Sequence, residues 1–233
     1  MTKEALFDQI RGGLIVSCQA LASEPLYGSE YMAKMAVAAA EGGAAGIRAN
    51  TPEDIKAIRA AVDLPVIGLY KAEYPDSEVY ITPTMKEVDA LMEVRPDMIA
   101  MDATDRVRPA GMTLEEFFPL VRAKYPDMLF MADCSSFEDA ARAQELGFDV
   151  AGTTMRGYTA ATKGIAIPDY DMLHEMTMKL SIPVIAEGGV WEREQLQRVY
   201  QEGILSAVIG TAITRPRDIT RRFVEAIRGE EKA

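Results

Sequence analysis

The sequence predicts a single (β/α)8 TIM barrel, an α/β fold, that spans residues 1–233 and carries an extra N-terminal helix. Short runs rich in Val and Ile alternate with amphipathic stretches of helical period, which is typical of a parallel sheet covered by helices. The length of 233 residues suits such a barrel, which commonly has about 250. The run Leu64-Pro65-Val66-Ile67 also recurs as Ile182-Pro183-Val184-Ile185, four βα units further along the chain. An open doubly wound sheet is the alternative, but no glycine-rich dinucleotide motif follows the first strand.

The strands are expected where apolar, β-branched runs occur, at residues 13–19, 45–49, 65–71, 97–102, 128–133, 149–153, 183–187 and 207–211. The repeated runs fall on the third and seventh strands, which lie opposite each other in a closed barrel of eight. These two strands should therefore bring their side chains to the mouth from facing walls.

The helices are expected between the strands, at residues 29–42, 52–62, 84–94, 113–124, 136–146, 169–180, 191–202 and 217–228. Start signals support them, since Thr51 precedes Pro52 and Thr113 precedes an acidic first turn. Gly42, Gly147 and Gly203 stand where a left-handed residue can end a helix. Residues 3–10 are expected to form the additional helix, which closes the bottom of the barrel.

Composition excludes several classes of protein. Hydrophobic residues make up 48% of the chain and charged residues 26%, which excludes disorder and low-complexity repeats. The net charge of −11 repels nucleic acids and anionic membranes. Cys18 and Cys134 are too few for a disulfide framework, and no stretch is typical of a signal peptide or membrane span. We expect a cytoplasmic protein that binds neither nucleic acid nor membrane.

Polar side chains gather where the predicted strands end, and chemistry in such barrels takes place at that carboxyl-terminal mouth. The last residues of the strands are Gln19, Arg48, Lys71, Asp102, Asp133, Thr154, Glu187 and Thr211, with Arg215 just beyond. The strand bodies carry almost no charge, so the charged strand ends form a candidate active site rather than an ordinary solvated rim.

Lys71 and Glu187 are the most informative pair. Lys71 follows Pro65, and Glu187 follows Pro183, by an even number of residues, so both side chains should face the same way. A lysine and a glutamate would then point into the mouth from opposite walls. This arrangement suits removal of a proton from one face of a carbon and delivery of a proton to the other.

A phosphate site is expected after the seventh and eighth strands. Gly188-Gly189 and Gly210-Thr211 offer backbone N–H groups there, as in the usual phosphate site of this barrel class. Arg215 can add charge-assisted hydrogen bonds to phosphate oxygens. Together these residues predict a small phosphorylated substrate.

The whole chain resembles the N-acetylmannosamine-6-phosphate 2-epimerase family. The resemblance is carried by the runs at 46–50, 65–71, 81–84, 131–135, 152–158, 186–189 and 214–216, whose sequences are GIRAN, PVIGLYK, ITPT, MADCS, GTTMRGY, AEGG and TRP. It implies interconversion of N-acetylmannosamine 6-phosphate and N-acetylglucosamine 6-phosphate in sialic acid and aminosugar breakdown. Matched by motif, Lys71 is the catalytic lysine and Glu187 its acidic partner, and the substrate-binding positions are Gln19, Arg48, Asp133 and Arg215.

The residues permit this chemistry. Lys71 can remove the proton at C2, beside the open-chain aldehyde, only when neutral, so its pKa must fall through burial or a nearby cation such as Arg48. Arg48 or Gln19 can stabilise the developing oxyanion, and Glu187 either returns a proton or holds Lys71 in place. Asp133 is expected to bind a sugar hydroxyl or to tune the lysine. The segment 156–168 is long enough to act as a lid.

Other chemistries have less support. His174 lies in a predicted helix, away from the mouth, so Ser-His-Asp and Cys-His mechanisms lack a base, and zinc or iron lacks a histidine ligand. We therefore expect neither a metal nor a cofactor. A Schiff-base aldolase with a strand-end lysine and a non-catalytic phosphosugar-binding barrel are the remaining alternatives. A homodimer is one assembly that the sequence leaves open.

Overall fold

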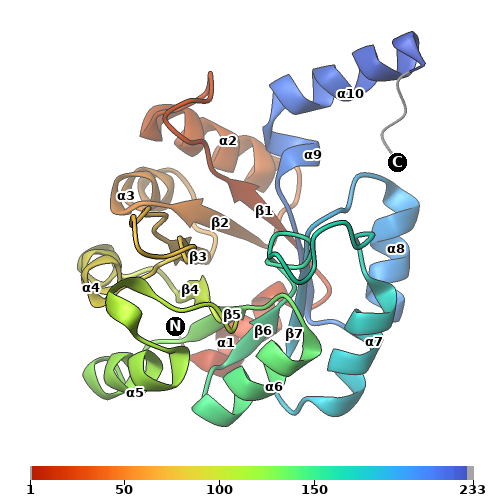
Figure 1. Cartoon of the computed structure of the whole chain (residues 1–233). Coiled ribbons are helices and arrows are strands. Elements are labelled where there is room, and N and C mark those ends of the chain that lie inside the picture. The colour runs from red at the N-terminus through yellow and green to blue at the C-terminus, as the bar shows by residue number, and fades with distance from the viewer. Residues whose placement is uncertain (1, 230–233) are drawn as a thin grey trace.

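Eight parallel strands close into a barrel in the order β1 to β8, and helices surround it (Figure 1). The computed structural model describes residues 2–229, so residues 1 and 230–233 of the predicted domain lie outside the described part. The predicted (β/α)8 fold and its extra N-terminal helix are confirmed. None of the helices within residues 2–229 has both the length and the apolar character needed to cross a membrane.

The bounds of the elements follow the predicted order. The strands are β1 Leu14–Cys18, β2 Gly46–Asn50, β3 Val66–Leu69, β4 Met98–Asp102, β5 Phe130–Asp133, β6 Val150–Gly152, β7 Val184–Glu187 and β8 Ser206–Ile209. The helices are α1 Lys3–Ile10, α2 Ser29–Glu41, α3 Pro52–Ala61, α4 Met85–Val94, α5 Leu114–Lys124, α6 Phe137–Leu146, α7 Tyr170–Lys179, α8 Arg193–Gln201, α9 Thr211–Thr214 and α10 Pro216–Arg228, with a 3₁₀ turn, η1, at Pro109–Gly111.

Local signals account for several helix ends. At the start of α5, Thr113 Oγ1 accepts a hydrogen bond from the Glu116 N–H, and the Glu116 side chain accepts one from the Thr113 N–H. Gly147 ends α6 in the left-handed conformation, with φ of +94°. After α2, however, Gly42 keeps φ at −76° and Gly43 takes the left-handed position at +89°. The prediction for Gly42 was wrong because Gly42 keeps a right-handed backbone conformation and the left-handed residue is the next one, Gly43.

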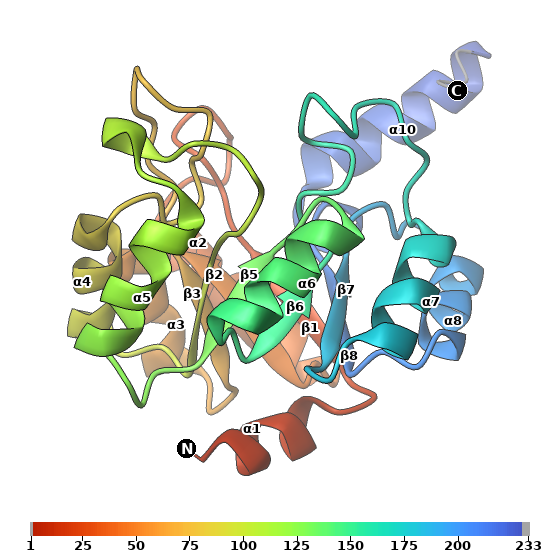
Figure 2. The ribbon, with the colours of Figure 1, turned by 60° about the horizontal axis from the view of Figure 1, so that its bottom comes forward.

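The core has two layers. An outer layer lies between the sheet and the helices, and an inner column fills the barrel. α1 lies beneath the barrel in Figure 2, and its buried residues Leu6, Phe7 and Ile10 belong to the inner column. The same column continues up to Met131 and Met155, so packed side chains run from the helical plug to the mouth.

Two predicted strands end two residues earlier than expected. The third strand was predicted to reach Lys71, but β3 ends at Leu69 because the next residues pair with a returning segment instead. Lys71 forms an antiparallel bridge with Ile81, and the Ala72 N–H donates to the Tyr80 carbonyl at 3.0 Å. This returning segment lies between the ends of β3 and β4, since the Asp102 N–H donates to the Ile81 carbonyl.

The last strand also ends early. It was predicted to reach Thr211, but β8 ends at Ile209, Gly210 precedes α9, and Thr211 is already helical. The single helix predicted at 217–228 is preceded by α9 and begins at Pro216. Figures 1 and 2 both show α10 pointing away from the barrel wall, and none of its described residues is buried.

Candidate active site

Arg48, on β2, holds together three strands at the mouth. Its side chain is 0% exposed, and its Nη2 and Nη1 atoms lie 2.6 and 3.1 Å from the two carboxylate oxygens of Asp133 on β5. Nη1 also donates to Glu187 Oε2, on β7, at 2.7 Å. Burial opposes the charge of Arg48, but the two carboxylates outweigh it and hold its pKa above the ordinary value. The mouth therefore contains a permanent buried cation between two acids.

Thr154 links the two carboxylates. Its hydroxyl lies 2.6 Å from Asp133 Oδ1 and 3.1 Å from Glu187 Oε2. The sequence placed Thr154 at a strand end but gave it no role, because its partners come from β5 and β7, on either side of β6. The signal that could have identified Thr154 is its place just beyond β6, because the two neighbouring strands, β5 and β7, both end in an acid.

Lys71 lies beside this network, just beyond β3. Its backbone N–H donates to Asn50 Oδ1 at 2.8 Å, which fixes the backbone as the chain leaves the sheet. Burial, together with the positive charges of Arg48 and Arg215, lowers the pKa of Lys71 to about 8, against the smaller opposing effects of Glu187 and Asp133. This agrees with the expectation that burial and Arg48 make the lysine available as a neutral base.

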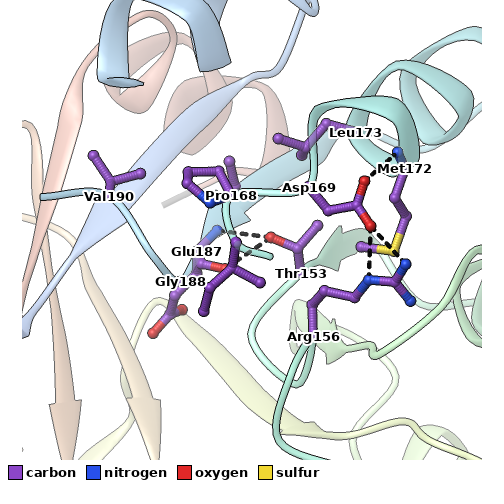
Figure 3. A pocket seen from close by; sticks show the side chains of 11 residues that line it. Thr153, Arg156, Pro168, Asp169, Met172, Leu173, Glu187, Gly188 and Val190 are labelled. Carbon is purple, nitrogen blue, oxygen red and sulfur yellow. Dashed lines mark hydrogen bonds and ion pairs between the residues drawn. The ribbon is translucent and has the colours of Figure 1, made fainter. Parts of the chain in front are cut away.

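Glu187 approaches the same centre from β7. Burial raises the pKa of its carboxyl, with a contribution from Asp133, against the opposing effect of Arg48. Thr153 fixes its backbone, because Thr153 Oγ1 donates to the Glu187 carbonyl and accepts from the Glu187 N–H, both at 2.9 Å (Figure 3). Lys71 and Glu187 thus share Arg48 as a neighbour although they belong to opposite strands.

Gln19 and Asp133 differ in how much hydrogen-bonding capacity they leave for a ligand. Gln19 donates from Nε2 to Ser17 Oγ at 2.8 Å, while its buried Oε1 has no partner among residues 2–229. Asp133 is 0% exposed, and both of its oxygens already accept hydrogen bonds from Arg48. The structure thus presents Asp133 as the residue that orients Arg48, and Gln19 as a residue with an unused acceptor.

The predicted phosphate residues follow the ends of the paired strands β7 and β8, whose register joins Glu187 to Val208. Gly188 and Gly189 have φ of +105° and +75°, and a Cβ on Gly189 would overlap the backbone carbonyl of Ile167. Arg215 lies between α9 and α10, with Nη2 3.3 Å from Glu24 Oε2. Glu24 comes from the loop after β1, and the sequence gave no sign of this contact.

The segment 156–168 is tied down at both ends. Arg156 donates to Asp169 Oδ2 at 2.5 and 2.9 Å (Figure 3). It also donates to the Ser135 carbonyl at 3.0 Å. Between these ties, Ile167 lies against Gly189. The segment therefore packs on the predicted phosphate loop, and its predicted action as a lid stays a prediction.

Two hollows lie near the charged cluster. The one in Figure 3 is lined by Glu187 and by Thr153, Pro168 and Met172 among others, and its volume of about 10 Å³ fits one water. A groove of about 470 Å³ runs along α4 and α5 and includes Arg108 and Phe117. Neither hollow is lined by Lys71 or Arg48. The candidate active site is therefore identified by its charged side chains and not by the volume of a cavity.

Other reactive groups lie away from this chemistry. His174, on α7, is exposed and its Nδ1 lies 3.1 Å from Glu202. Cys18 and Cys134 are buried free thiols, and burial raises the pKa of Cys18 to about 12. Across residues 2–229, no group of three or more His, Cys, Asp and Glu side chains is placed to hold a metal ion. The expectation of no metal stays a prediction.

Comparisons with known proteins agree with this geometry. A family model described as "Putative N-acetylmannosamine-6-phosphate epimerase" matches residues 32–229, which include every predicted site residue except Gln19. Two relatives, from Enterobacter sp. (strain 638) and Listeria welshimeri, are described as "Putative N-acetylmannosamine-6-phosphate 2-epimerase". The first is 52% identical over 226 residues, 96% of each chain, and the second 50% identical over 223 residues, 95% of this chain and 94% of the relative.

Solved structures extend the comparison. The N-acetylmannosamine-6-phosphate 2-epimerase from Clostridium perfringens is 46% identical and superposes with a TM-score of 0.90, covering 95% of this chain and 96% of its own. Thiamine phosphate pyrophosphorylase from Pyrococcus furiosus, at 19% identity and a TM-score of 0.63, covers 97% of this chain and 96% of its own and is similar in fold alone.

Proposed function

The chain belongs to the N-acetylmannosamine-6-phosphate epimerase family, and from this we infer that it is a carbohydrate epimerase, an isomerase, that inverts C2 of N-acylmannosamine 6-phosphate to give N-acylglucosamine 6-phosphate. The substrate is a small phosphosugar, and the pathway we propose is the breakdown of sialic acid and N-acetylmannosamine. The observation that carries the mechanism is the position of Lys71, which is half-buried just beyond β3 and near Arg48, where its pKa is lowered to about 8.

Lys71 is the base in this proposal. In the open-chain sugar, C2 lies next to the aldehyde carbon, so its C–H bond is acidic enough for a positioned amine. A neutral Lys71 takes the proton, and the negative charge moves to the carbonyl oxygen. Arg48 supplies a buried cation for that oxygen, and its Nε has no hydrogen-bond partner among the described residues. Gln19 directly follows β1, which pairs with β2, and is the second candidate ligand for the sugar.

Reprotonation on the opposite face completes the inversion. Glu187 either delivers this proton or holds Lys71 while the same lysine serves both faces. Its raised pKa supports a proton-carrying role, whereas its bonds to Arg48 and Thr154 support a positioning role. Asp133 keeps Arg48 oriented in both versions.

The phosphate binds at the other end of the sugar in this proposal. Gly188, Gly189, Gly210 and Thr211 offer backbone N–H groups, and Arg215 offers a guanidinium within reach of the same ends of β7 and β8. The effect of Arg215 on the pKa of Lys71 supports this placement, because it brings the phosphate end close to the reacting end.

A homodimer is the assembly that we propose, with a second copy covering the apolar face of α10. Phe223 and Ile227 are 69% and 86% exposed on this helix, which is unusual for large apolar side chains. The two free thiols support the proposal that the enzyme works in the reducing cytoplasm.

A Schiff-base aldolase is the rival function, because a lysine with a lowered pKa also attacks carbonyls. Borohydride added during turnover separates the two. An aldolase would be trapped as a covalent adduct at Lys71, whereas the epimerase would keep an unmodified Lys71 in mass spectrometry.

The direct test is to incubate the protein with N-acetylmannosamine 6-phosphate in deuterated water and follow C2 by NMR. We expect N-acetylglucosamine 6-phosphate to form with deuterium at C2. Cleavage of the carbon chain, or binding without any change at C2, would contradict the proposal.

We also predict that turnover needs no metal, because Lys71 and Glu187 carry the proton themselves. Exhaustive treatment with a chelator should leave kcat unchanged in the same NMR assay. A loss of activity that only an added divalent ion restores would contradict this prediction.

A further inference from the structure

Tyr80 lies on the segment that folds back along Lys71. The Ala72 N–H donates to the Tyr80 carbonyl at 3.0 Å, and the next residue, Ile81, bridges Lys71 itself. This segment continues beside β4, where the Asp102 N–H donates to the Ile81 carbonyl at 3.1 Å. The backbone of Tyr80 is therefore fixed next to the proposed base, on the side of the mouth formed by β3 and β4.

The Tyr80 hydroxyl donates to the sulfur of Met155 at 3.9 Å. A thioether is a weak acceptor, so this contact uses little of the hydroxyl's capacity to donate. The ring packs on the inner column that reaches the mouth at Met155, which is 0% exposed. Burial, with the nearby carboxylates of Asp133 and Asp102, raises the pKa of Tyr80, so the hydroxyl keeps its proton at neutral pH.

This side of the mouth lies opposite the phosphate end. β4 and β8 are four strands apart in the closed barrel, and the proposed phosphate residues follow β7 and β8. A donor beside Lys71 and away from the phosphate faces the C1–C2 end of the sugar. The acylamino group is the substituent that C2 carries there, and its carbonyl oxygen is a strong acceptor.

We propose that the Tyr80 hydroxyl donates to the carbonyl oxygen of the substrate's 2-acylamino group, in exchange for its weak contact with the buried sulfur of Met155. Tyr80 is then a specificity-determining residue that distinguishes acylated aminosugar phosphates from plain sugar phosphates. This inference rests on the proposed function. It adds the recognition of a group that takes no part in the proton transfer.

The test measures binding, so that it does not depend on turnover. The probes are two open-chain alditols without a reactive aldehyde, 2-acetamido-2-deoxyglucitol 6-phosphate and glucitol 6-phosphate, titrated by calorimetry. Tyr80→Phe removes the hydroxyl and keeps the ring, and Tyr31→Phe is the matched control, because Tyr31 is 41% exposed on α2 and has no part in the proposed site.

The wild type should bind the acetamido compound more tightly than glucitol 6-phosphate. Tyr80→Phe should weaken the acetamido compound about tenfold, the effect of one neutral hydrogen bond, and glucitol 6-phosphate less than about twofold. Tyr31→Phe should change neither. Equal weakening of both compounds, or no weakening of either, would overturn the inference. If the wild type binds both but does not epimerise its substrate, the proposed function fails, while the ratio of dissociation constants still decides the role of Tyr80.

Discussion

Arg48 controls how charge is distributed over the reacting residues. It pairs with Asp133 and Glu187, whereas Lys71 lies near this cation and forms no ion pair within residues 2–229. A direct carboxylate partner would raise the pKa of a lysine, whereas burial and the charges of Arg48 and Arg215 lower the pKa of Lys71 to about 8. The identity of three side chains on three strands thus supports the proposal that a fourth, Lys71, acts as the base.

Exchange of the C2 hydrogen separates the roles of Lys71 and Glu187. Lys71→Ala should abolish both epimerisation and exchange in deuterated water, because it removes the base that starts the reaction. Glu187→Gln keeps the shape but cannot carry a proton at neutral pH. If Glu187 delivers the second proton, this variant should still exchange deuterium into one epimer while epimerisation falls by orders of magnitude.

If Lys71 serves both faces alone, exchange and epimerisation of Glu187→Gln should decline together and by less. Both rates come from one NMR time course with the wild type as reference. Substantial epimerisation by Lys71→Ala would contradict both versions and the assignment of the base.

The pH profile should report the pKa of Lys71. Since its pKa of about 8 lies below the ordinary value, the residue is charged and inactive at lower pH. We expect kcat/KM to rise about tenfold per pH unit between roughly 6.5 and 7.5 and to level off above about pH 8. Arg215→Gln removes one of the charges that lower this pKa, so it should move the break to higher pH besides raising KM. A break that stays in place would contradict the assignment.

The elements follow from local patterns. Each predicted strand and helix exists because apolar runs and capping residues act over a few neighbours, as Thr113 and Glu116 do at α5. The ends of β3 and β8 differ from prediction for a non-local reason, since hydrogen bonds from residues 80–82 and the turn at Gly210 end them. The residues next to Lys71 in the sequence do not indicate that residues 80–82 fold back and pair with them.

The same division applies to the candidate site. Arg48, Asp133 and Glu187 were predictable because parallel strands bring their carboxyl ends to one mouth. Tyr80 and Glu24 were not, because they stand on loops whose paths depend on tertiary contacts. The roles of all these residues toward a ligand stay predictions.

The contact between the segment 156–168 and the loop at Gly189 can be tested by one methyl group. Gly189→Ala adds a Cβ that overlaps the Ile167 carbonyl at a positive φ, so the loop must move. We expect KM to rise at least about tenfold, with a loss of about 1–3 kcal/mol in the free energy of unfolding. Gly203→Ala is the control, because φ is +82° there and a Cβ would meet nothing within 4 Å. An equal rise of KM in both variants would show that strain alone, and not the contact, causes the effect.

At the scale of the molecule, α10 makes the assembly testable. Its exposed apolar side chains should lie against a second copy, so the wild type should sediment as a dimer at micromolar concentration. Phe223→Glu combined with Ile227→Glu places two charges on that face and should yield monomers in sedimentation velocity. Arg228→Glu, on another side of the helix, should leave the dimer intact. A wild type that stays monomeric would contradict the proposed homodimer.

The plug formed by α1 has a consequence for substrate traffic. Because Leu6, Phe7 and Ile10 fill the lower end and packed side chains continue to Met155, the barrel offers no passage through its axis. Substrate arrives and product departs by the same opening, and each epimer must leave before the other can enter. Each epimer should therefore act as a purely competitive inhibitor of the conversion of the other, and net flux should follow the ratio of their concentrations rather than any direction built into the protein.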